Sequence, residues 1–423
     1  MPDFMTILLV LFYFLFPVFI IYLTHKFTYL NKAGTVVLAY IFGLILGNMG
    51  IIPQASNGFR AILKDKTNLP GQEAIELFHQ GLISQSDIIA NQVATVQNTL
   101  IIIVILFAIP LLLFSLDLKK WLKIASEALL SLALAMASLL AAVFIGFYIY
   151  KDLIDESWKI SGMLIGLYTG GTPNLAAIST GLKVNANTFL LTNTYDMVIG
   201  GICLVFLMTV AQRFFNLFLP SFSHKHAMEI TEIDIDQSED MDSFVGILSK
   251  VGIVELLKGF GVASIVVVIG GGISMLVPQS SQMVTAIVSI TTLGLLFSNW
   301  KVINKIGNTF QLGMYFIIVF SLVVASMGNL ANMFHIEYLH LFSFVALVVI
   351  GSMAIHVFLA YLFKIDTDTT IISMTALTYS PPFVPVVAGA LKNKNVIISG
   401  LTVGILGYAI GNYLGLAVAY FLR

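Results

Sequence analysis

Long apolar stretches recur along the chain, and each is long enough to cross a membrane as a helix. About 20 apolar residues are needed to span the hydrocarbon core. The stretches are continuously apolar and do not alternate with a period of two, so helices are predicted and the strands of an outer-membrane barrel are not. About twelve transmembrane helices are predicted, near residues 5–23, 34–53, 97–116, 125–149, 161–182, 187–211, 259–277, 283–299, 309–328, 339–363, 369–391 and 395–422.

Two polar stretches interrupt this pattern. Residues 55–96 mix charges of both signs and are expected to form a solvated cap. Residues 212–258 include an acidic run, in which seven of the 22 acidic residues lie between Glu229 and Asp242, and such a run is typical of a solvated linker. The predicted organisation is therefore a first transmembrane repeat at 1–211 with the cap as an insertion, an acidic linker at 212–258 and a second repeat at 259–423.

Comparison of the chain with itself indicates two homologous halves. Three short segments recur in the same order: Phe42–Asn48 and Leu293–Asn299, Asn98–Thr99 and Asn308–Thr309, and Gly181–Lys183 and Ala390–Lys392. The first half has 41 additional residues between the first and second of these segments. This excess matches the polar cap, which is why the cap is interpreted as an insertion.

The orientation of the two halves in the membrane is ambiguous in the sequence. Six spans in each half would make the repeats parallel. In the second half, the basic residues Lys301, Lys305 and Lys364 lie in the opposite set of loops from the basic residues of the first half. This difference favours inverted repeats. Inversion requires that one span is re-entrant, split or wrongly counted, and the sequence leaves these alternatives open.

The composition excludes several classes of protein. Of the 423 residues, 58% are hydrophobic and 10% charged, and the mean hydropathy is +0.96. A soluble core cannot bury so many apolar side chains, so a soluble enzyme and a disordered scaffold are excluded. The net charge of −1 gives no electrostatic attraction to nucleic acid. The single cysteine, Cys203, excludes an internal disulfide. Lipid is therefore the expected surrounding and nucleic acid is not an expected partner.

The fifth span of each half contains residues that a lipid-facing helix avoids. The first reads Tyr168-Thr-Gly-Gly-Thr-Pro-Asn174 and the second Thr378-Tyr-Ser-Pro-Pro-Phe-Val-Pro385. Proline and paired glycines break helices, and the freed backbone groups need protein or water around them. A pair of broken helices at matching positions indicates a transport site, although two structural proline kinks would give the same pattern. The candidate substrate-binding residues are Thr169, Gly170, Gly171, Thr172, Pro173, Asn174, Tyr379, Ser380, Pro381, Pro382 and, in the last span, Asn412.

Asp196 is the one carboxylate that the sequence places deep within a span. An aspartate at the bilayer centre costs about 2.5–3.5 kcal/mol on insertion scales, so it calls for a cation, a proton or a hydrogen-bonding partner. Asn193 precedes it by three residues and lies on the same helix face. Asp196 and Asn193 are therefore the candidate ligands of a coupling ion, Na⁺ or H⁺, and no other cofactor is expected. A structural acid that is hydrogen-bonded to Thr192 is the alternative.

Two other features have structural interpretations. Gly407, Gly411 and Gly415 recur at every fourth residue of the last span, a pattern that is typical of close helix packing. His356 lies in the middle of a span, where a hydrogen bond between helices is the more common role of a lone histidine.

The chain resembles the YjcL-like family of uncharacterised multipass bacterial membrane proteins. The resemblance is carried by the break at Gly170–Asn174, the helix with Asp196 and the glycine pattern of Gly404–Gly415, of which the last is the most specific. It implies the superfamily of cation–proton antiporters and bile-acid–sodium symporters, with two inverted repeats and a discontinuous crossing helix in each. It further implies that Asp196 and Asn193 bind an ion beside the crossing, and that the protein lies in the bacterial inner membrane. A homodimer is a candidate assembly.

The sequence therefore favours a secondary active transporter, coupled to Na⁺ or H⁺, that moves a small anionic organic solute by alternating access. A cation–proton antiporter without an organic substrate is the alternative, followed by a channel or receptor. We expect no enzymatic activity, because the sequence has no His-Glu-x-x-His or Gly-x-Ser-x-Gly motif, and it lacks the P-loop that ATP-driven transport would need.

Overall fold

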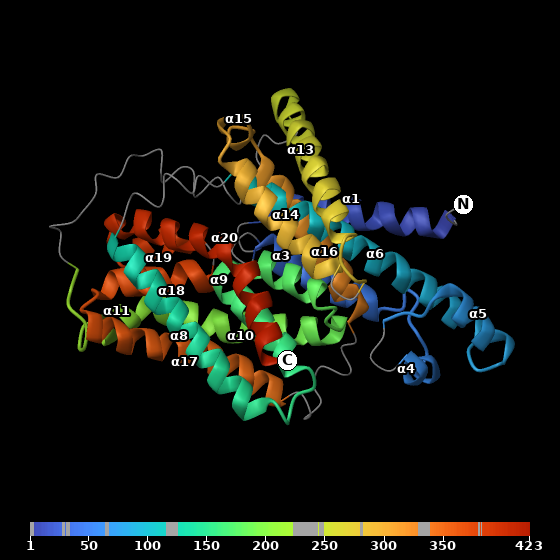
Figure 1. The fold of residues 1–423 in the computed structure, drawn as a ribbon, viewed down its shortest axis with the longest axis horizontal. Helices are drawn as coiled ribbons and strands as arrows, with labels where there is room; N and C mark the ends of the chain where they lie inside the picture. Colours follow the sequence, from blue (N-terminus) through green and yellow to red (C-terminus); the bar gives the residue numbers. More distant parts are fainter. Residues whose placement is uncertain are drawn as a thin grey trace. The chain divides into compact units, whose positions relative to one another are not determined.

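The computed structural model describes most of the chain as helices joined by short turns (Figure 1). The described residues are 4–27, 30, 34–63, 67–115, 126–222, 244, 249–279, 282–328, 339–379, 381 and 383–423. They contain no β-strand, which confirms the all-helical prediction for this part of the chain. The acidic run between Glu229 and Asp242 lies outside the described residues, and so do Ser380 and Pro382 of the second predicted break.

Eight of the described helices are long and apolar enough to cross a membrane. They are α1 (Phe4–Lys26), α6 (Gln85–Phe114), α8 (Ser126–Tyr150), α10 (Ala186–Thr209), α13 (Lys250–Ser274), α16 (Thr309–Met327), α17 (Leu339–Phe363) and α20 (Ile397–Leu422). Two shorter apolar helices are α3 (Thr35–Asn48) and α14 (Gln282–Ser298). Every predicted span overlaps a described helix, while the number of twelve membrane crossings stays a prediction.

The helices form two compact units that are interleaved along the chain. The first unit comprises residues 1–106, 183–191 and 314–338, and the second comprises 107–182, 192–313 and 339–423. The helices α6, α10 and α16 each contribute residues to both units.

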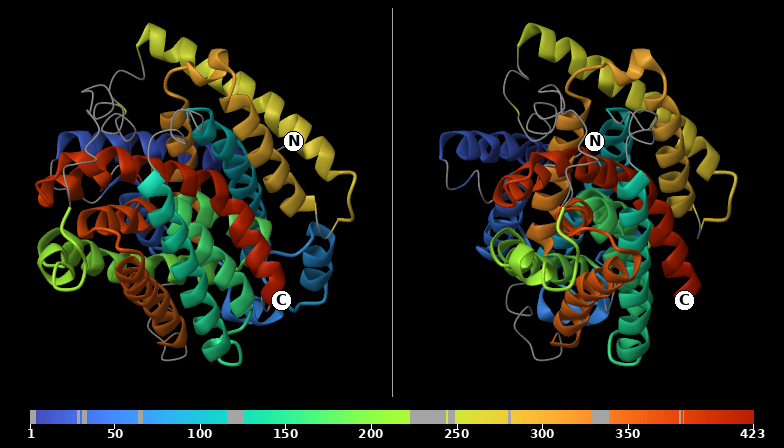
Figure 2. Two further views of the ribbon diagram at one scale, coloured as in Figure 1. Left: turned by 60° about the vertical axis from the view of Figure 1, so that its left-hand side comes forward. Right: turned by 90° about the vertical axis from the view of Figure 1, so that its left-hand side faces the viewer.

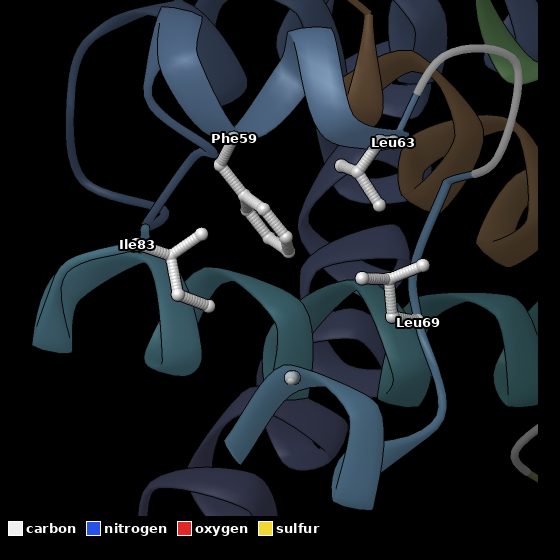
Figure 3. Packing of buried hydrophobic residues seen from close by; sticks show 5 residues of the cluster. Phe59, Leu63, Leu69 and Ile83 are labelled. Carbon is white, nitrogen blue, oxygen red and sulfur yellow. The ribbon is translucent and has the colours of Figure 1, made fainter. Parts of the chain in front are cut away.

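The predicted cap has a small hydrophobic core of its own within the first unit. It contains α4 (Asn57–Leu63), α5 (Gly71–His79) and the beginning of α6, and Figure 3 shows its buried side chains facing one another. Asp87 fixes this core to α6, because its carboxylate accepts hydrogen bonds from the backbone amides of Ser56 (2.8 Å) and Ser84 (3.0 Å). The helix α6 begins at Gln85 and continues through Asn98–Thr99, so this pair lies inside a helix, whereas Thr309 begins α16.

The second unit is built around helices that are buried on nearly every side. The helix α9 (Ser157–Gly181) packs along the C-terminal helix α20, drawn in red in Figures 1 and 2. The helix α18 (Thr367–Tyr379) packs against both and is followed by α19 (Phe383–Ala390). Two helix pairs, α8 with α17 and α13 with α14, complete the larger contacts. Three short helices connect these elements: α11 (Ala211–Phe215), α15 (Lys301–Asn304) and η4 (Lys394–Val396).

Candidate functional site

The helix α9 is interrupted where its sequence predicts a break. Tyr168 has dihedral angles φ −90° and ψ 16°, and Gly171 has φ 70° and ψ −164°. A conformation such as that of Gly171 is essentially restricted to glycine, because a Cβ atom would clash with the backbone. Pro173 follows and has no N–H to donate to the preceding turn. The residue types at Gly170–Asn174 therefore explain the break.

The interruption of α9 is filled by the glycine face of α20. A methyl group on Gly407 would overlap the backbone carbonyl oxygen of Thr169, and one on Gly411 would overlap the side chain of Asn174. Asn174 donates a hydrogen bond from Nδ2 to the backbone oxygen of Tyr408 at 3.4 Å. The close-packing role predicted for this glycine ridge is thus confirmed, and the broken backbone is surrounded by protein, as a membrane interior requires.

The second predicted break lies between two described helices. The helix α18 ends at Tyr379 and α19 begins at Phe383. Pro381, between them, is buried, and a methyl group on Gly404 of α20 would lie 2.8 Å from its Cγ. The helix α20 therefore contacts both segments that the sequence singled out.

Asp196 lies on α10 between these two segments. Tyr168, at the interruption of α9, donates a hydrogen bond from its hydroxyl to Oδ1 of Asp196 at 2.7 Å. Tyr379, the last residue of α18, donates to the backbone oxygen of Gly200 at 2.8 Å. The position of a Cβ atom on Gly200 would be 3.6 Å from Oδ1 of Asp196 and 3.5 Å from the ring of Tyr379. The half-buried carboxyl group is thus brought together with one tyrosine from each segment.

Asp196 has no ion-pair partner in the described part of the chain, whereas Lys159 pairs with Glu156 and Lys258 with Glu255. The described residues also contain no group of three or more histidine, cysteine or acidic side chains that could hold a metal ion. Among the described residues, a cation at Asp196 would therefore have this one carboxylate and neutral oxygen atoms as ligands.

Asn193 is almost completely buried, with 1% of its surface exposed. Its Nδ2 atom has no hydrogen-bond partner among the described residues. A buried polar group left unpaired costs about 1–3 kcal/mol, which an incoming ligand can offset. A side-chain amide can present its oxygen or its NH₂ group by a rotation of about 180°. Asn193 can therefore serve a cation or an anion.

The other predicted residues are used within or between helices. Thr169 donates to the backbone oxygen atoms of Ile165 (2.7 Å) and Gly166 (3.2 Å) of its own helix. Asn412 donates from Nδ2 to Oγ1 of Thr291 on α14 at 3.2 Å, and its Oδ1 has no partner among the described residues. Thr172 is half-buried. No recorded contact joins these three to Asp196.

A small cavity of about 20 Å³ lies beside Tyr168. Its polar lining consists of Tyr168, Ser352, His356 and Thr378, and a cavity of this size has room for about one water molecule. His356 is 2% exposed, with Nε2 at 3.5 Å from Oγ of Ser131 and with no partner for Nδ1 among the described residues. The predicted hydrogen bond between helices is therefore at the limit of hydrogen-bonding distance.

Two residues near the site were missed by sequence reasoning, and so was a further buried acid. No sequence pattern indicated a role for Gly200, and Tyr168 was notable only for its position at the break. The sequence singled out Asp196 as the one acid deep in a span, and the structure adds Asp368, which lies at the start of α18 and is buried, with 6% exposed. Its carboxylate accepts hydrogen bonds at 2.8 Å from Nε2 of Gln212 and Nδ2 of Asn393.

Comparison with known proteins places the whole site within one family. A family model described as "Protein of unknown function (DUF819)" matches residues 74–423. The chain is also 22% identical over 325 residues to the "Uncharacterized membrane protein YjcL" of Bacillus subtilis (strain 168), across 74% of this chain and 80% of that relative. With eight described helices that are long and apolar enough to cross a membrane, the chain is an integral multipass membrane protein. The sequence resemblance to YjcL-like proteins is thereby confirmed, and the chain belongs to the DUF819 family.

Proposed function

We propose that this protein is a secondary active transporter of the bacterial inner membrane, coupled to Na⁺ or H⁺, that moves a small anionic organic solute by alternating access. The observation that carries the proposal is the contact of Asp196 with Tyr168 at the interruption of α9, beside Tyr379 at the end of α18. An ionisable residue inside a membrane protein marks an ion or substrate pathway by default. Interrupted helices are where transporters bind their substrates.

The positions of the two interruptions support a repeat architecture. Gly181–Lys183 and Ala390–Lys392 are 209 positions apart, since 390 − 181 = 209. Lys183 and Lys392 both have a left-handed backbone, with φ 52° and 56°, just after their helices end. The same offset pairs Gly171 with position 380, between α18 and α19. These correspondences support two homologous halves, each with one discontinuous helix, and we propose that the halves are inverted, as in the cation–proton antiporter and bile-acid symporter superfamily.

The chemistry of the site suits coupling to a cation. A carboxylate that lacks a cationic partner binds Na⁺ or a proton, and either one neutralises it inside the membrane. The part of α9 that follows Gly171 starts a new run of helical backbone, and the positive N-terminal end of a helix favours an anion. We propose that Asp196 with Asn193 binds the coupling ion and that the interrupted backbone contributes to binding of the solute.

A cation–proton antiporter without an organic solute is the second candidate. The observation that favours it is the small cavity beside Tyr168, which has room for about one water and not for a solute. In this candidate, Asp196 exchanges a proton for Na⁺, and the hydroxyl of Tyr168 and a water molecule in the cavity are its neutral oxygen partners.

Proteoliposomes that contain the purified protein test both candidates. We expect an imposed Na⁺ or H⁺ gradient to drive accumulation of a small carboxylate against its own gradient, and we expect Asp196→Asn to abolish this dependence. Asp152→Asn, which removes an exposed carboxylate between α8 and α9, serves as the control. If Na⁺ alone dissipates a proton gradient and no solute accumulates, the antiporter is correct. If Asp196→Asn behaves like the wild type, both proposals are wrong.

A further inference from the structure

A polar cavity in the first unit shares no lining residue with the site around Asp196. Its volume is about 250 Å³. The walls come from the beginning of the cap, one face of α6, the start of α10 and the end of α16. The polar side chains important to its chemistry are Gln54, Arg60, Gln97, Asn185, Asn187 and Ser326.

The charge of this lining is positive. Arg60 is the one charged side chain among the described residues that line the cavity, and no carboxylate is among them. One nitrogen of the Arg60 guanidinium, Nη2, donates to Oε1 of Gln54 at 2.7 Å. No recorded ion pair in the described part of the chain includes Arg60. A guanidinium group has five N–H donors in a planar fork that matches a carboxylate, so this half-buried cation has the geometry and charge to bind an anion.

The cap holds Arg60 in place. Its neighbour Phe59 is 1% exposed and Leu63, one turn later on α4, is 7% exposed, and both are anchored in the hydrophobic core of the cap (Figure 3). Gln54 is fixed in turn, because its Nε2 donates to the backbone oxygen of Gly47 at 2.5 Å. The guanidinium group is therefore positioned before a ligand arrives, which lowers the entropic cost of binding.

The remaining walls provide space and neutral polar groups. Ala90 and Ala94 lie one turn apart on α6, and their small side chains leave the cavity open. Gln97, one turn further, is fixed by hydrogen bonds from Nε2 to the hydroxyl of Tyr13 (2.7 Å) and to Oγ of Ser326 (3.1 Å). Asn185 accepts a hydrogen bond from the backbone amide of Asn187 at 2.8 Å and so caps the start of α10. Amides and hydroxyls of this kind bind hydroxyl or keto groups.

We propose that this cavity binds a small carboxylate that carries a hydroxyl or keto group, with Arg60 as the residue that recognises the carboxylate. The volume of about 250 Å³ is below the roughly 300–1,000 Å³ of pockets for drug-sized ligands, which favours a small ligand. One guanidinium group balances one negative charge, so a monocarboxylate fits better than a phosphate. Identification of this ligand as the transported solute rests on the proposed function, whereas the binding site itself does not.

Thermal stabilisation of the purified full-length protein by lactate, pyruvate and inorganic phosphate, at constant ionic strength, tests the inference. A ligand that binds the folded state raises the melting temperature. We expect lactate or pyruvate to stabilise the wild type, and Arg60→Gln to weaken this binding about 10- to 100-fold, the loss that corresponds to a hydrogen bond with a charged group. Arg213→Gln, which removes an exposed arginine on α11, should bind like the wild type.

Ala94→Leu provides a second variant that keeps the charge and fills the cavity, in case Arg60→Gln does not fold. It should also abolish stabilisation by lactate or pyruvate. Undiminished binding in either folded variant, stabilisation by phosphate alone or no stabilisation by any of the three probes would overturn the inference. Asp196→Asn separates this site from the proposed transport mechanism, since it should retain binding of the carboxylate even if coupled transport is lost.

Discussion

The hydroxyl of Tyr168 donates a hydrogen bond of 2.7 Å to Oδ1 of Asp196, across 28 positions of the chain. The donor stands at the interruption of α9 and the acceptor on α10. This contact links the backbone break to the carboxyl group. Binding or release of an ion at Asp196 would therefore act directly on the segment where α9 is interrupted.

The Tyr168–Asp196 contact is expected to contribute measurably to stability. A hydrogen bond with a charged group contributes about 1.5–3 kcal/mol, and Tyr168→Phe removes the donor while leaving the ring in place. Denaturation of Tyr168→Phe, Asp196→Asn and the double variant in detergent should give a coupling energy of about 1–2 kcal/mol.

Tyr379 provides the matched control for this cycle. Its hydroxyl donates to the backbone oxygen of Gly200 and not to the carboxylate. The pair Tyr379→Phe with Asp196→Asn should therefore show a coupling energy of less than about 0.5 kcal/mol. Equal coupling for the two tyrosines would contradict the assignment of Tyr168 as the specific partner of Asp196.

Local signals explain how much of this molecule could be predicted. The helices and the interruption of α9 follow from runs of apolar residues and from Gly171 and Pro173, which act within a few positions of the chain. The partners of the buried acids could not be predicted in this way. Tyr168 meets Asp196, and Gln212 meets Asp368 from 156 positions away, because helix packing sets these contacts and hydropathy does not encode it.

The contact between α20 and the interruption of α9 should not tolerate a side chain at Gly407. An added methyl group would overlap the carbonyl oxygen of Thr169 and lie 2.8 Å from Cδ2 of Leu377. Since a backbone carbonyl cannot move aside cheaply, Gly407→Ala is expected to lower the free energy of unfolding by about 1–3 kcal/mol. The melting temperature of the purified variant measures this loss.

Gly272, near the end of α13, is the control for Gly407. A methyl group there meets nothing within 4 Å. Because alanine favours a helix over glycine by about 0.5–1 kcal/mol, Gly272→Ala should leave the protein as stable as the wild type or slightly more stable. If Gly407→Ala were as well tolerated as Gly272→Ala, the close approach of α20 to α9 would be wrong.

The carboxylate of Asp368 is expected to be structural, in contrast with that of Asp196. Both of its oxygen atoms accept hydrogen bonds from side-chain amides, one from Gln212 and one from Asn393. Asp368→Asn would turn one NH₂ group toward another, so we expect a loss of about 2–3 kcal/mol in the free energy of unfolding. Cation-dependent transport by the folded fraction should be unchanged.

An exchange of the two residues distinguishes this explanation from a general effect of charge. The double variant Asp368→Asn with Asn393→Asp restores one acceptor opposite one donor and keeps the total charge. It should recover at least half of the stability that Asp368→Asn loses, whereas Asp152→Asn, at an exposed position, should lose almost none. If the exchanged variant is no more stable than Asp368→Asn alone, the hydrogen-bond pair does not explain why this acid is buried.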